Sequence, residues 1–265
     1  LNITGNEVFN YAWRLNDTTA TYGTTQKTLV TVEGVKSVSG ISLNEKVVTL
    51  PASALNKSKV TVSNGYTLSL ADDVPKTSIT RAWSLKETTA TYKQTTTAGY
   101  SLASDKKSVS YSTAAVETLA TVKGVKAVEG LSLDGKTITV SESSLNAKKV
   151  TVSDDYNLKL ADNVLETSTK KEWSLDETTA KYDQITVAGY ALASDKKSIS
   201  YKDAAIKTLA TVKGVKSLDG LSLKNNVITV SEAALNQARV TVSNDYTLKL
   251  GSDVAKSSTK KAWNL

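Results

Sequence analysis

A phrase of ten residues occurs three times in this chain, and it constrains the fold more than any other feature. Its copies occupy residues 13–22, 83–92 and 173–182, each running from a Trp to a Tyr, and the phrase begins again at Trp263. A tandem array contains such repetition by construction, whereas a single enzyme domain has no need of it. The sequence therefore predicts a repeat protein.

The spacing of the copies predicts the domain organisation. The last three tryptophans are 90 residues apart, whereas the first interval is only 70, so the first copy lacks 20 residues. Residues 1–12 match the other copies poorly and are either a cap or part of an incomplete unit. We expect the chain to be a piece of a longer protein. The predicted domains are a shortened first repeat at 1–82, a second repeat at 83–172, and a third at 173–265 that includes the start of the next.

The 20 residues that the first copy lacks can be read in the other two. They correspond to residues 99–111 and 189–201 with their flanks, where both copies contain Gly-Tyr, then Leu-Ala-Ser-Asp-Lys-Lys-Ser, then Ser-Tyr. The omission leaves the remaining sequence in register, which is typical of a discrete structural element. We expect this stretch to form a hairpin or one rung of a coil.

Apolar and polar residues alternate through most of each repeat. A period of two in segments rich in Thr, Val, Ile and Tyr, such as 221–223 and 246–250, predicts half-buried strands. Tight hairpin turns are predicted at Asp134-Gly135 and at its counterparts Asn44-Glu45 and Asn225-Asn226. Longer polar turns are predicted at 104–107, 194–197, 64–65, 154–155 and 244–245.

Two kinds of segment interrupt the alternation. Residues 51–56, 141–146 and 231–236 predict a single helical turn, with Ser141 and Ser231 as N-caps. Residues 201–207 are a candidate for a second turn. Because strand patterns dominate, we expect an all-β fold class with at most short helical turns.

Two architectures fit this list of elements. The favoured one is an elongated tandem array of ~90-residue antiparallel, hairpin-rich units. The alternative is a continuous β-solenoid, in which the loss of one rung costs little.

Composition argues against most enzyme classes. The chain contains neither cysteine nor histidine, so thiol nucleophiles, zinc thiolate sites, the Ser-His-Asp scheme and most metallohydrolase schemes are excluded. We expect no enzyme and assign no catalytic, cofactor-binding or metal-ligating residue. A glycan-cleaving enzyme, which needs only two carboxylates facing a cleft, is the enzymatic alternative that remains.

The net charge of +7 does not by itself indicate a nucleic-acid binder. The lysine doublets are spread along the chain beside Ser, Thr and Asp, and the arginines are few. We therefore expect a solvated, solubilising surface and no nucleic-acid partner. No apolar run approaches the ~20 residues of a membrane helix, so we expect no membrane insertion of this segment. The doublets are 106–107, 148–149, 170–171, 196–197 and 260–261.

Tryptophans and carboxylates are the remaining site candidates. Regularly spaced Trp residues could stack on sugar rings, but a chain with only 6% aromatic residues is expected to use them in small cores or at joints between repeats. The acidic residues at 71–73, 154–155, 161–163 and Asp183 could bind calcium at repeat junctions. We expect them to be polar turn residues instead, since none follows a calcium-loop spacing.

Several phrases of the repeat resemble those of a known class of protein. Residues 90–92, 99–111, 119–126, 130–140 and 150–156 look like the tandem repeats of large secreted or surface-attached bacterial proteins of the adhesin type. The resemblance covers nearly all of the chain except residues 1–12, and it lies in repeat style rather than in a catalytic motif.

This resemblance implies an extracellular stalk or adhesive array on a bacterial cell surface. The expected partners are neighbouring repeats of the same chain, with a glycan or cell-surface protein as the ligand of an adhesive role. The alternative from another class is a carbohydrate-binding module, which an exposed Trp or Tyr beside a groove would support.

Overall fold

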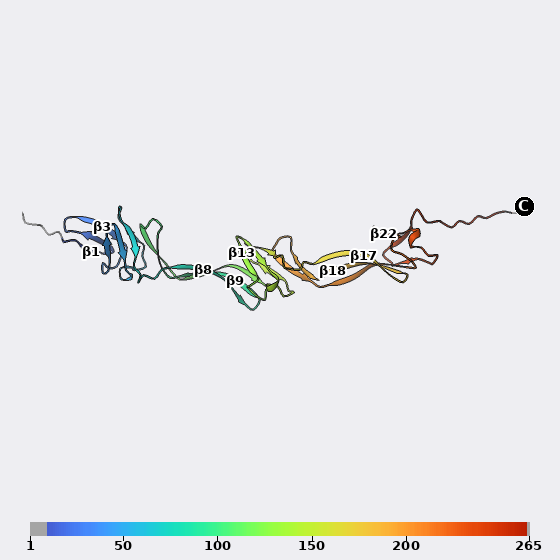
Figure 1. Cartoon of the computed structure of the whole chain (residues 1–265), viewed down its shortest axis with the longest axis horizontal. Helices are drawn as coiled ribbons and strands as arrows, with labels where there is room; N and C mark the ends of the chain where they lie inside the picture. The colour runs from blue at the N-terminus through green and yellow to red at the C-terminus, as the bar shows by residue number, and fades with distance from the viewer. Residues whose placement is uncertain (1–9, 264–265) are drawn as a thin grey trace, which may run out of the picture. The chain divides into compact units, whose positions relative to one another are not determined.

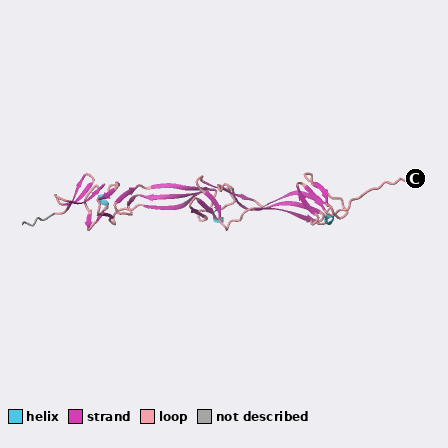
Figure 2. Ribbon diagram, turned by 90° about the horizontal axis from the view of Figure 1, so that it is seen from above, coloured by secondary structure: helices cyan, strands magenta, loops and turns pink. Residues whose placement is uncertain are grey.

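The computed structural model describes residues 10–263, and almost every regular element in them is a strand (Figure 2). The predicted all-β fold class is therefore confirmed. The chain divides into two compact units: the first takes the residues up to Lys86 and Ala90–Thr121, and the second takes Glu87–Thr89 and the residues from Val122 onward. Figure 1 labels some of the strands. In the part of the chain that the structure describes, helix is limited to three single 3-10 turns, Ala52–Ala54, Glu142–Ser144 and Glu232–Ala234.

The first unit contains the first copy of the repeat and the hairpin of the second. Its six-stranded sheet has the order β1-β2-β3-β6-β11-β10, and a small three-stranded sheet has the order β4-β5-β7. The first unit also contains β8, nearly all of β9 and most of β12, three long strands from the start of the second copy. The strands are β1 (Ala12–Asn16), β2 (Thr19–Gly23), β3 (Thr28–Glu33), β4 (Ser42–Asn44), β5 (Val47–Leu50), β6 (Val60–Val62), β7 (Thr67–Leu70), β8 (Ser78–Lys86), β9 (Thr89–Thr97), β10 (Gly99–Leu102), β11 (Ser108–Ser112) and β12 (Ala115–Lys123).

The second unit repeats this arrangement and then begins it again. Strand β15 pairs with the end of β12 and with β20, and a three-stranded sheet has the order β13-β14-β16. The third copy forms the sheets β17-β18-β21-β24 and β22-β23-β25. The strands are β13 (Leu131–Asp134), β14 (Thr137–Val140), β15 (Val150–Val152), β16 (Asn157–Leu160), β17 (Ser168–Asp176), β18 (Thr179–Val187), β19 (Gly189–Leu192), β20 (Ser198–Lys202), β21 (Ala205–Lys213), β22 (Leu221–Lys224), β23 (Val227–Val230), β24 (Thr241–Val242) and β25 (Thr247–Leu250).

Strand pairing follows the sequence alternation. In β14, Ile138 and Val140 are buried while Thr137 and Thr139, which alternate with them, are half-buried, as a period of two requires. Most strand pairs are antiparallel, but each copy also contains one parallel pair: β5 with β7, β14 with β16, and β23 with β25. The cores formed in this way are small and consist mainly of Val, Leu and Ile.

The predicted tight hairpins are present, with the turn one residue later than expected in the first two copies. Asp134 is the last paired residue of β13, so the loop residues are Gly135 and Lys136. Gly135 has φ 55°, and Asn225 and Asn226 in the third copy have φ 49° and 62°. Such left-handed angles suit Gly and Asn, which explains the residues at these turns.

The helical predictions are only partly right. The 3-10 turns lie where the sequence predicted a helical turn, but neither Ser141 nor Ser231 caps its turn through the side chain. The hydroxyl of Ser141 instead lies 2.8 Å from that of Ser143. A second turn at 201–207 is wrong, because this segment ends β20 and starts β21, where Ile206 pairs with Ile185. Ladder hydrogen bonds outweigh a single isolated helical turn.

The predicted cap at 1–12 falls mostly on residues 1–9, which lie outside the described residues. Of the remainder, Tyr11 stacks on Tyr22 with ring centroids 6.0 Å apart, and Ala12 begins β1.

Candidate functional surfaces

The segment that the first copy lacks forms a hairpin that packs on the copy before it. Strand β11 lies beside β6 of the first copy, where Val109 pairs with Val60. Strand β20 lies beside β15 of the second copy in the same way, where Ile199 pairs with Val150. We call β10–β11 and β19–β20 the donor hairpins. Each is therefore encoded in one copy of the repeat and completes the core of the preceding copy.

A tyrosine anchors each donor hairpin. The Tyr190 hydroxyl accepts a hydrogen bond from the backbone N–H of Ala147 at 2.7 Å. The backbone N–H of Tyr190 donates to the carbonyl of Leu165, and its carbonyl accepts from the N–H of Thr167. Tyr100 is bound in the same way, by the N–H of Lys57 at 2.8 Å, and is buried. Because the partners are backbone groups, the anchor does not depend on which side chain follows the loop asparagine.

A lysine of each donor hairpin binds the preceding copy. The Lys197 ammonium group donates to the backbone carbonyls of Asp154 and Tyr156, both at 2.6 Å, and Lys107 donates to the carbonyl of Tyr66. The second lysine of each doublet is thus a structural donor, which corrects the prediction that both doublets are merely solvated. The sequence feature that indicated this donor role was the same position of the lysine doublet in both copies of the segment that the first copy lacks.

Within residues 10–263, no hairpin strand pairs with the equivalent surface of the third copy. Among the described residues, β24 ends the sheet order β17-β18-β21-β24, whereas β6 and β15 each have a hairpin strand beyond them. Leu248 is 38% exposed and Leu250 46%, while their counterparts Leu158 and Leu160 are buried. An edge strand next to exposed leucines is a surface on which another strand can pair.

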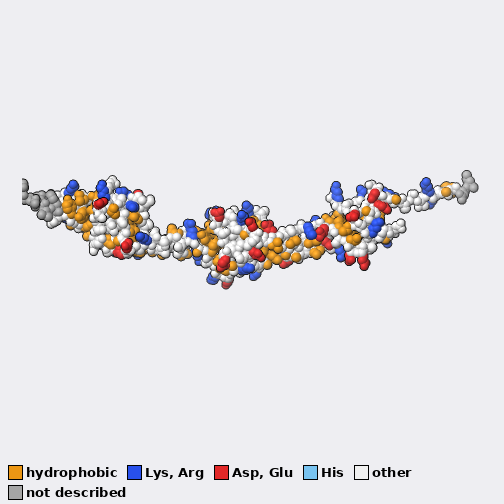
Figure 3. Space-filling view, viewed as in Figure 1, with side chains coloured by type: hydrophobic (Ala, Val, Ile, Leu, Met, Phe, Trp, Pro, Cys, Tyr) orange, Lys and Arg blue, Asp and Glu red, His pale blue; other side chains and the backbone are white. Residues whose placement is uncertain are grey.

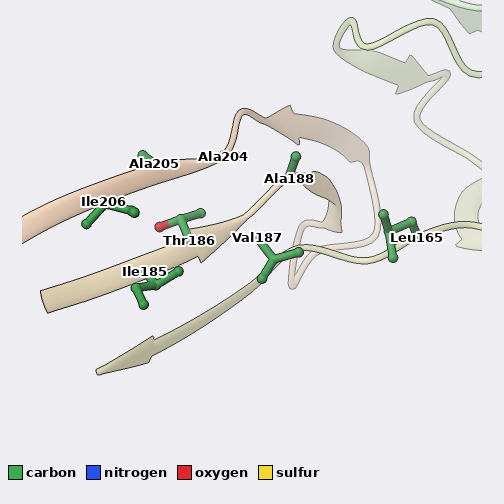
Figure 4. A pocket seen from close by; sticks show the side chains of 8 residues that line it. All are labelled: Leu165, Ile185, Thr186, Val187, Ala188, Ala204, Ala205 and Ile206. Carbon is green, nitrogen blue, oxygen red and sulfur yellow. The ribbon is translucent and has the colours of Figure 1, made fainter. Parts of the chain in front are cut away.

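A separate apolar hollow lies at the ends of β18 and β21. It has a volume of about 630 Å³, and Figure 4 shows its side chains, which come from both strands and from the segment before β17. Ile206 is 72% exposed and Leu165 67%. Figure 3 shows hydrophobic side chains gathered on the surface in this region, while acidic and basic side chains are interspersed elsewhere. Exposed apolar surface of this kind marks interaction sites. The lining residues are Leu165, Ile185, Thr186, Val187, Ala188, Ala204, Ala205 and Ile206.

The apolar lining contributed by β18 differs in sequence from the equivalent strand of the second copy, and this difference gives a test. The second copy has Thr95 and Thr97 where the third has Ile185 and Val187. We expect the double variant Ile185→Thr, Val187→Thr to lose binding of a hydrophobic dye such as anilinonaphthalene sulfonate. Stability should change by less than about 1 kcal/mol, because Thr suits exposed strands. Fluorescence titration measures the first effect and thermal unfolding the second.

The matched control for this experiment is Ile79→Thr. Ile79 is exposed in the first unit and does not line the hollow. Dye binding should survive this change, and equal loss in both variants would show that the dye reports surface hydrophobicity in general.

Trp13, Trp83 and Trp173 pack against a tyrosine of their own copy. Trp173 lies opposite Tyr182 in the β17–β18 ladder, with ring centroids 5.0 Å apart, and both border the core of the third copy. Trp13 pairs with Tyr22 in the same way, at 5.2 Å. Trp263, by contrast, is 95% exposed.

Two of the acidic candidates, Asp73 and Asp183, accept hydrogen bonds within their own copy, and Asp253 does the same in the third copy. Asp73 accepts from the N–H of Ala52 at 3.3 Å, and Asp253 accepts from that of Glu232 at 3.2 Å. Asp183 accepts from the hydroxyl of Thr208 at 2.7 Å. In the part of the chain that the structure describes, no three acidic side chains come close enough together to hold a metal ion.

Within residues 10–263, one ion pair is present, between Lys170 and Glu172 at 3.0 Å on an exposed part of β17. No helix in the same residues is long and apolar enough to cross a membrane.

Comparisons with protein-family models, with curated proteins and with solved structures found no match for the chain.

Proposed function

We propose that this chain is part of the structural, adhesive repeat region of an extracellular bacterial surface protein, where it spans distance as a stalk. The observation that carries the proposal is the donor hairpin. Val109 and Ile199 are fully buried in the preceding copy, so consecutive copies share their cores. A chain built in this way grows by adding copies, and its stability comes from the junctions between neighbours.

The strands between the cores support a spanning role. Strands β17, β18 and β21 have nine residues each and form one antiparallel ribbon between the cores of the second and third copies. Nine residues in a strand rise roughly 30 Å. Each added copy thus contributes a ribbon of this length at the cost of few buried residues.

The finer architecture belongs to the same proposal. Independent bead-like units would each bury all of their own hairpins, whereas here both donor hairpins are buried by the preceding copy. We therefore favour a continuous β-array, which is closer to the solenoid alternative than to separate beads. Most strand pairs in this array are antiparallel.

The apolar hollow is the surface that we assign to partner binding. Its lining contains no aromatic ring and a single hydroxyl, from Thr186. Sugars need stacking rings and polar groups, so this lining suits an apolar protein surface on a host or neighbouring cell better than a glycan.

Small-angle X-ray scattering on chains of different length tests the spanning role. We would compare the present chain with one in which residues 83–172 are duplicated in tandem. The maximum dimension should increase by at least roughly 30 Å, the rise of one ribbon. A compact globule would grow by only about 12% in radius for the same added residues, and that result would rule out a stalk.

A further inference from the structure

The third copy has a hollow where the other two copies hold a tyrosine. This hollow has a volume of about 540 Å³ and is lined by Gln237 and Ala255, among others. These residues are the counterparts, 90 positions on, of Ala147 and Leu165, whose backbone groups bind Tyr190. A hollow bordered by the equivalent backbone segments is therefore present in the third copy, and no tyrosine of the described residues lines it.

The rest of the acceptor surface is also in place. In the second copy, the N–H of Leu158 donates to the carbonyl of Lys196, and that of Val152 donates to the carbonyl of Lys197. Their counterparts Leu248 and Val242 lie on strands with the same partners within the copy. These N–H donors are backbone groups, so they persist despite the sequence differences between the copies.

We propose that the third copy binds a β-hairpin with the sequence of residues 189–202, supplied by a further repeat of the same kind. The occupant's tyrosine enters the hollow at Gln237, and its isoleucine lies opposite Val240. Its second lysine reaches the carbonyls of Asn244 and Tyr246. The occupant is specified by two examples within this chain, since the first and second copies each bind such a hairpin.

This binding mode is strand addition to an open sheet edge, in which main-chain hydrogen bonds supply affinity and side-chain pockets supply specificity. Burying the exposed side chains of Leu248 and Leu250 adds apolar contact to these main-chain bonds. The inference deepens the proposed function by identifying what joins one copy to the next. It would still hold if the array had a role other than spanning distance.

Hydrogen exchange measured by mass spectrometry on an extended chain tests the proposal. The extension appends a copy of residues 176–213 after Leu265, so that the new hairpin follows Trp263 at the natural spacing. Amide exchange in 240–250 should slow about tenfold or more, toward the rate of 150–160 in the same molecule. The second copy is thus an internal reference.

A control extension carries Ala and Asp at the positions equivalent to Tyr190 and Ile199. It should leave exchange in 240–250 as fast as in the original chain. Equal protection by both extensions would overturn the proposal, because it would indicate non-specific cover. Unchanged exchange with the intact hairpin would also overturn it.

A second arm uses a synthetic peptide of residues 187–203 added to the unextended chain. Protection of the amides in 240–250 should rise with peptide concentration and should be absent with a peptide that carries Tyr190→Ala. This result would support binding of a hairpin supplied by a separate molecule. Protection that rises with protein concentration alone would mean that two β24 edges pair with each other, and would overturn the assignment of the occupant. Neither arm depends on the scattering measurement. The hairpin-binding proposal and the spanning role can therefore be contradicted independently of each other.

Discussion

Replacing Leu158 by alanine is expected to destabilise the second copy by about 2–5 kcal/mol, the usual cost of a Leu→Ala change in a core. Leu158 is 1% exposed beneath the donor hairpin β19–β20. The measurement is native-state hydrogen exchange in residues 131–160, where the opening free energy of the second copy can be followed separately from that of the third.

The chain contains its own control for this change. Leu248 occupies the same position in the third copy, where no hairpin covers it among the described residues. Leu248→Ala should cost about 1 kcal/mol or less, as is usual for partly exposed sites. Equal losses at both positions would contradict the view that the hairpin completes the core.

Replacing Gly124 by alanine is expected to cost about 3 kcal/mol or more, because two penalties add. Gly124 has φ +91°, which non-glycine residues rarely adopt, and an added Cβ would overlap the carbonyl oxygen of Lys149. The carbonyl of Lys149 belongs to the main chain, as does Gly124 itself, so neither can shift without a large cost in free energy. Urea unfolding followed by tryptophan fluorescence, together with exchange in β12 and β15, measures the loss.

The control is Gly135→Ala in the same copy. Gly135 also has a positive φ, 55°, but nothing lies within 4 Å of an added Cβ. Only the conformational penalty remains, about 1 kcal/mol. If the two variants were equally stable, the close approach at Gly124 would not be important for the fold.

Much of the local structure could be predicted from the sequence. Alternation located the strands because a strand with one buried face must repeat every two residues. The 20-residue omission identified the donor hairpins as discrete elements, since a segment can be removed cleanly only if its two ends lie close together. The Asn and Gly residues at 225–226 and 135 marked turns that need left-handed angles.

What could not be predicted was which copy each hairpin joins. Periodicity reports that Ile199 is buried, but not that Val150 of the preceding repeat covers it, because strand pairing is non-local. The same limit hid the role of Lys197, whose acceptors Asp154 and Tyr156 lie in the preceding repeat. The hollow at Ile206 was missed because exposed and buried apolar residues look alike in a β pattern.

The backbone nature of the docking contacts bears on how such a gene can change. A hairpin that is bound through Tyr190 to an amide and through Lys197 to carbonyls fits any acceptor with the same main-chain path. Unequal recombination between repeats would then yield alleles with more or fewer copies. In each of them, every donor hairpin would still find the backbone groups that bind its tyrosine and lysine. Point mutations would accumulate in the acceptors, as Ala147 and Gln237 already illustrate, without uncoupling the series.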